Sequence, residues 1–114
     1  MRFKKVLFCF TVLFFVHIIC IGQNLPSDSL LSKARDFIGR SVPDEAIPLL
    51  LKIIEDKSVT QEKVTYTQIN LAEAFREKHE HKKGIDLLYT VLKKMDFSRY
   101  NHAYACNRLA ALYN

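Results

Sequence analysis

The chain has 114 residues with only three glycines and three prolines, which allows one small domain and favours helix over strand. Of the formal net charge of +5, three positive charges lie in the first five residues; residues 23–114 carry 14 basic and 12 acidic side chains, too small an excess to predict nucleic-acid binding. Only Cys106 lies outside residues 1–22, which excludes an internal disulfide in the remainder of the chain.

Residues 1–22 have the pattern of a secretory signal peptide. A basic start precedes an apolar run over residues 6–22, and the small residues Cys20 and Gly22 predict cleavage before Gln23. We therefore expect the remaining chain to be exported to the periplasm or the extracellular space. The apolar run is near the lower limit for crossing a bilayer, so a retained inner-membrane anchor at residues 6–22 is the alternative. A membrane partner is expected only if the leader is retained.

Two helices are predicted between residues 27 and 55. Ser27 or Asp28 is expected to cap the first helix, and apolar residues at helical spacing follow them. Gly39 ends this helix, and Pro43 begins the second because the first turn of a helix does not need its missing N–H. The second helix is densely apolar and extends to about Glu55.

Three further helices follow the polar connector at residues 56–60. One is predicted from about Gln61 to about Lys78, and the residues 79–82 form a corner. The next extends to about Lys94, and a last helix begins at about Arg99 and continues to the chain end. The chain is therefore expected to be all-α.

Small and apolar residues recur at positions i and i+38 along these helices. The matched positions are Ala34 with Ala72, Phe37 with Phe75, Ala46 with Gly84, Ile47 with Ile85, Leu50 with Leu88, Ile53 with Val91 and Ile54 with Leu92. Another step of the same length from Leu71, Ala72 and Phe75 reaches Leu109, Ala110 and Tyr113. We call this spacing of 38 residues the repeat period. A fixed period of this kind predicts an array of helix-hairpin repeats.

The pattern resembles the tetratricopeptide repeat. In that family a large apolar residue, a small residue and an aromatic residue on the first helix are followed by a small and two apolar residues on the second. The sequence places Leu71, Ala72, Phe75, Gly84, Leu88 and Val91 at these positions. Lys33 departs from the pattern, and the repeat period exceeds the usual length of about 34 residues.

The resemblance implies a helix-turn-helix solenoid of about two and a half repeats over residues 23–114, incomplete at the C-terminal end. It also implies a concave face built by the first helices of the repeats. On that face we expect a partner protein or peptide to contact Tyr66, Asn70, Arg76, Tyr104 and Arg108. Some members of the family hold a peptide's terminal carboxylate; Asn70 and Arg108 match two of the five positions that do so, which is too few to predict that function.

The predicted function is therefore that of a protein-interaction module, in the context of the N-terminal sensing part of a bacterial membrane signalling protein. The alternative is a structural protein that self-associates through an exposed face at Leu109, Leu112 and Tyr113. No glycine-rich phosphate loop or serine nucleophile motif occurs, so neither an enzyme nor a cofactor is expected.

Histidine and cysteine are the remaining side chains that are able to bind a metal ion or to react as a nucleophile. His79 and His81 lie in a solvated corner without further ligands at metal-binding spacing, so no metal site is expected. Cys106 is expected to be a buried small residue, because free cysteine is usually buried.

Overall fold

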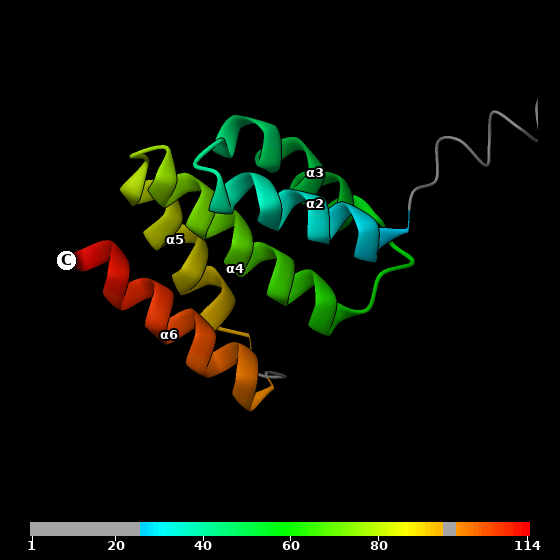
Figure 1. Cartoon of the computed structure of the whole chain (residues 1–114). Helices are drawn as coiled ribbons and strands as arrows, with labels where there is room; N and C mark the ends of the chain where they lie inside the picture. The colour runs from blue at the N-terminus through cyan, green and yellow to red at the C-terminus, as the bar shows by residue number, and fades with distance from the viewer. Residues whose placement is uncertain (1–25, 95–97) are drawn as a thin grey trace, which may run out of the picture.

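The computed structural model describes residues 26–94 and 98–114, and these fold into helices connected by short turns (Figure 1). The helices are α2 (Ser27–Gly39), α3 (Pro43–Glu55), α4 (Gln61–Glu77), α5 (His81–Leu92) and α6 (Arg99–Tyr113). The all-α prediction is confirmed for these residues. The predicted leader at residues 1–22 lies outside the described residues.

The helices begin where the local chemistry satisfies their first N–H groups. Thr60 and Ser98 cap α4 and α6, since each side-chain oxygen accepts a hydrogen bond from the backbone N–H three residues later. Pro43 begins α3 as predicted. The cap expected from Ser27 or Asp28 is wrong: α2 begins directly after Pro26, whose carbonyl accepts the N–H groups of residues 29 and 30.

The corners after α2 and α4 lie one repeat period apart and have the same hydrogen-bond pattern. Ser41 and His79 have the left-handed φ values of 59° and 63°. The residue after each one donates its backbone N–H to a carbonyl five residues back, at 2.9 Å from Val42 to Phe37 and 2.8 Å from Glu80 to Phe75. This is the Schellman arrangement, which ends a helix and reverses the chain within a few residues. The sequence period therefore has a structural counterpart.

Helices α2 and α3 form one helical hairpin, and α4 and α5 form a second (Figure 1). Helix α6 packs on both α4 and α5. Helix α4 contacts each of the other four helices, and α2 and α6 lie on either side of it. Two apolar clusters result. The first joins α2, α3 and α4 around Ala34, Ala46 and Leu50.

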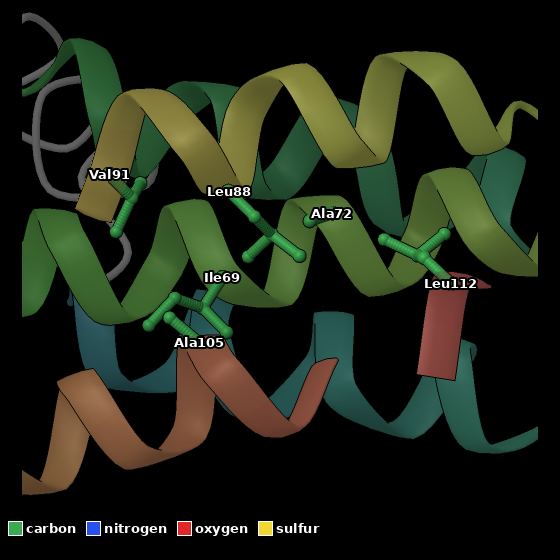
Figure 2. Close-up of a cluster of buried hydrophobic side chains, with 6 residues drawn as sticks. All are labelled: Ile69, Ala72, Leu88, Val91, Ala105 and Leu112. Carbon is green, nitrogen blue, oxygen red and sulfur yellow. The ribbon is translucent and has the colours of Figure 1, made fainter. Parts of the chain in front are cut away.

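The second cluster joins α4, α5 and α6, and its six buried side chains lie along the contacts between these helices in Figure 2. They are Ile69 and Ala72 of α4, Leu88 and Val91 of α5, and Ala105 and Leu112 of α6. The small residues predicted at helix crossings serve this packing: Ala34, Ala46 and Ala72 are fully buried, and Gly84 lies directly against Ala72. Close approach of helices requires side chains of this size.

Candidate functional site

Helices α2, α4 and α6 present one shared polar and aromatic surface, with α4 as its floor. An open hollow of about 400 Å³ is lined by Leu31 of α2, by residues at the start of α4 and by Tyr100 and Asn101 of α6. A second hollow of about 210 Å³ lies farther along and is lined by Arg35, Ile38 and Gly39 of α2, Asn70 and Glu73 of α4, and Tyr104 and Arg108 of α6. We call this surface, with both hollows, the groove.

Three tyrosine rings lie together in the groove. Tyr66 comes from α4, and Tyr100 and Tyr104 come from one face of α6, four residues apart. The ring centroids are 5.6 Å apart for Tyr66 and Tyr104 and 6.2 Å apart for the other two pairs, with interplanar angles of 32–34°. Tyr66 and Tyr104 are half-buried, whereas Tyr100 is 67% exposed. We call these rings the tyrosine cluster.

Two arginines lie against the tyrosine cluster, one from each side of the groove. The Arg35 guanidinium of α2 is 6.0 Å from the centroid of Tyr66, and that of Arg108 of α6 is 5.2 Å from the centroid of Tyr104. Both distances lie within the range of about 6 Å over which a ring face attracts a cation.

A buried amide connects the tyrosines to the floor of the groove. Asn70 donates from Nδ2 to the Tyr66 carbonyl at 2.9 Å, and its Oδ1 accepts the Tyr104 hydroxyl at 3.5 Å. Burial raises the pKa of the Tyr104 hydroxyl, although the Arg108 charge opposes this. The hydroxyl therefore remains a neutral donor at ordinary pH.

Glu73 is the central anion of the groove, with 11% of its side chain exposed. Its carboxylate contacts Arg76 Nη2 at 2.6 Å and Arg108 Nη1 at 3.3 Å. Burial alone would raise the pKa of Glu73, but the hydrogen bonds and charges of the two arginines outweigh it and the pKa lies below the ordinary value. Glu73 is therefore ionised and positions Arg108 against the tyrosine cluster.

The structure brings together four of the five residues predicted to contact a partner. Asn70, Tyr104 and Arg108 line the second hollow, and Tyr66 contacts the Tyr104 ring and lines the first hollow. Arg76 lines neither hollow: it is held by Glu73 and by Glu77, the latter at 2.9 Å. Its role in the structure is to fix Glu73.

Sequence reasoning did not select Tyr100 or Arg35 as contact residues. Tyr100 precedes Tyr104 by four residues, which places both rings on one helix face, and that spacing was the available signal. Arg35 lies one repeat period before Glu73, so the period relates it to a residue of the groove floor. Neither signal reveals the contact with the ring of Tyr66 across the helices.

Two predictions about α6 are wrong. Cys106 is exposed instead of buried, because Ala105 and Leu112 occupy the inward face of this helix. Leu112 is only 8% exposed and packs within the second apolar cluster, so it is not part of a free face (Figure 2). Leu109 is half-buried against the same cluster, while Tyr113 is 63% exposed and its hydroxyl lies 3.2 Å from that of Tyr89.

Comparisons of the chain with models of known protein families, with curated proteins and with solved structures find no match. Within residues 26–94 and 98–114, no group of three His, Cys, Asp or Glu side chains is placed to hold a metal ion. No helix in the described part of the chain has both the length and the apolar character needed to cross a membrane. Any functional assignment therefore depends on the groove side chains themselves.

Proposed function

We propose that the chain is a protein-interaction module that binds a peptide or a protein segment along the groove formed by α2, α4 and α6. The observation that carries this proposal is the tyrosine cluster, flanked by Arg35 and Arg108 and open to solvent through Tyr100. Tyrosine and arginine dominate the energetics of protein interfaces, because they offer large contact areas together with hydrogen-bonding groups.

The rigidity of the groove supports binding of a ligand by a preformed surface. Asn70 and Glu73 are buried in α4, and between them they hold Tyr104, Arg76 and Arg108 by hydrogen bonds and ion pairs. Side chains held in this way lose little conformational freedom when a ligand binds, which favours affinity.

The proposed architecture is that of a tetratricopeptide-like array, and the corner geometry that recurs one repeat period later supports it. The proposed setting is an exported protein, as the composition of residues 1–22 suggests, and specifically the sensing part of a bacterial membrane signalling protein. In that setting the groove receives the segment whose presence is sensed.

Peptide selection against the chain tests the proposed function. A phage-displayed random peptide library is panned on the immobilised chain, and selected peptides are measured by isothermal titration calorimetry against wild type, Tyr104→Ala and Arg108→Gln. We expect each substitution to weaken binding about tenfold or more, as interface anchors typically do. Tyr89→Ala is the matched control, because Tyr89 is 44% exposed on α5 and lines neither hollow.

The control should bind within about twofold of wild type, because a residue outside the contact surface contributes little. Circular dichroism and melting temperatures of each variant separate lost binding from lost folding. Selected peptides that bind equally well to Tyr104→Ala and Arg108→Gln, or that lose binding in Tyr89→Ala, would contradict the groove as the binding surface.

A further inference from the structure

The free aromatic surface of the groove belongs mainly to Tyr100. The rings of Tyr66 and Tyr104 are half-buried and each has an arginine against it, whereas Tyr100 is 67% exposed at the mouth of the first hollow. The hollow beside it has a mixed lining of Leu31, Tyr66 and polar residues. Such a surface suits a small, rigid, apolar ring that packs on tyrosine and keeps its polar atoms in water.

Near the tyrosine cluster, free hydrogen-bond donors outnumber free hydrogen-bond acceptors. Among the described residues, Arg35 has a cation–π contact and no ion pair or hydrogen bond, so its five N–H donors are available. Arg108 Nε is buried without a hydrogen-bond partner. Two local acceptors are already engaged: Glu73 receives two arginines, and Asn70 Oδ1 receives the Tyr104 hydroxyl.

A ligand complementary to this surface has many acceptors and few donors. Glu62 is exposed in the lining of the first hollow and Lys63 there is paired with Asp28, so these three side chains together carry one net negative charge. The excess of donors is therefore concentrated between Arg35 and Arg108. A cationic ligand would be repelled there, and a segment with many free N–H groups would leave them unpaired.

We propose that the segment bound in the groove is proline-rich and adopts the polyproline II conformation. Proline offers a rigid ring to the tyrosines, has no backbone N–H and leaves its carbonyl free, because this helix has no internal hydrogen bonds. It has three residues per turn and advances about 3.1 Å per residue, so every third ring, about 9.3 Å along the helix, lies on the same side. One such ring would pack on the exposed face of Tyr100. The inference rests on the proposed function and names the ligand class of the same groove.

The test compares neutral blocked peptides of nine residues by calorimetry and by NMR titration of the full chain. The probes are a nonaproline peptide and a peptide of equal length in which serine and glycine replace every proline. We expect saturable binding of the nonaproline peptide, with binding of the serine-glycine peptide at least tenfold weaker. Tyr100→Ala and Arg35→Gln should each weaken nonaproline binding at least fivefold. Both residues are outside the apolar clusters, so the variants should fold.

Tyr113→Ala and Arg40→Gln are the matched controls. Each removes an exposed tyrosine or arginine that lines neither hollow, and nonaproline binding should remain within twofold of wild type. Absence of saturable nonaproline binding to the wild-type chain overturns the inference, as does equal binding of the two peptides. If library-selected peptides without proline bind and depend on Tyr104, the proposed function stands while its proline-rich ligand is rejected. If neither class of peptide depends on groove residues, both proposals are rejected.

Discussion

At the scale of single residues, the two helix-ending corners place ordinary L-residues in a conformation that suits glycine. Ser41 and His79 have φ values of 59° and 63°, where the side-chain Cβ crowds the backbone at a cost of about 1–2 kcal/mol per residue. The hydrogen bonds of Val42 and Glu80 to carbonyls five residues back hold this conformation in place. Glycine is the usual residue at this position because it has no Cβ.

His79→Gly should therefore stabilise the fold. The net gain should be about 0.5–1 kcal/mol, since relief of strain exceeds the extra backbone entropy that glycine gives to the unfolded chain. Urea denaturation followed by circular dichroism measures the change in the free energy of unfolding. His79→Ala keeps the Cβ and should show no comparable gain; an equal gain in both variants would mean that backbone strain is not the cause.

At the scale of helices, the crossing of α4, α5 and α6 depends on one glycine. A Cβ built on Gly84 would lie 3.1 Å from the Ala72 carbonyl oxygen and 3.2 Å from Leu112 Cδ1, which is tighter than ordinary contact. At the places one repeat period before Gly84 and Leu112, the chain has Ala46 and Ala74, both in the first apolar cluster. The larger Leu112 of α6 thus accompanies the smaller Gly84 of α5, whereas the corresponding pair one period earlier consists of two alanines. Close packing requires such matched sizes.

Gly84→Ala should destabilise the fold by about 1–3 kcal/mol, as overpacking of a filled core does. Leu112→Ala should cost about 2–5 kcal/mol by leaving a cavity. Because the two changes affect one contact, the double variant should be at least about 0.5 kcal/mol less destabilised than the sum of the single variants. The free energies of unfolding of all four proteins, measured in urea, give this coupling. Strict additivity would show that Leu112 is not what limits the space at residue 84.

The sequence predicted helix positions well where local chemistry determines them. Pro43 and Gly39 mark real boundaries, and the predicted start of the last helix at Arg99 is confirmed. The corner after α4 is shorter than predicted, since His79 reverses the chain and α5 begins at His81. The orientation of α6 was predicted wrongly: Leu112, expected on an exposed face, is buried against α4 and α5, and Cys106, expected to be buried, is exposed.

In the candidate site, too, the sequence predicted which residues share a helix face but not how residues on different helices contact one another. Tyr66, Asn70, Tyr104 and Arg108 were expected on one face from the tetratricopeptide resemblance, together with the period that places each residue on a side of its helix. The tyrosine cluster was not, because its ring contacts depend on how α6 lies beside α4. Glu73 forms ion pairs with Arg76 of its own helix and with Arg108 of α6. The sequence alone does not give the distance between α4 and α6, so it did not predict the second pair.

At the scale of the whole molecule, α4 is the element on which the others depend. It contacts α2, α3, α5 and α6, and it contributes Leu71 and Ala74 to one apolar cluster and Ile69 and Ala72 to the other. Helix α2 contacts only α3 and α4 within the described residues, and α6 only α4 and α5. In a helical fold stabilised by contacts between neighbouring helices, elements packed on one side only open more readily than the element in the middle.

Hydrogen exchange followed by NMR should therefore find the slowest backbone amides in α4, with faster exchange in α2 and α6. Ile69→Ala removes a fully buried side chain from α4 and should cost about 2–5 kcal/mol. It should also accelerate exchange in every described helix, because both clusters lose their shared support. Tyr113→Ala, at an exposed position in the last turn of α6, should change exchange only near that end. If Ile69→Ala accelerated exchange in α4, α5 and α6 but left α2 and α3 unchanged, the two clusters would be independent folding units rather than one cooperative unit joined by α4.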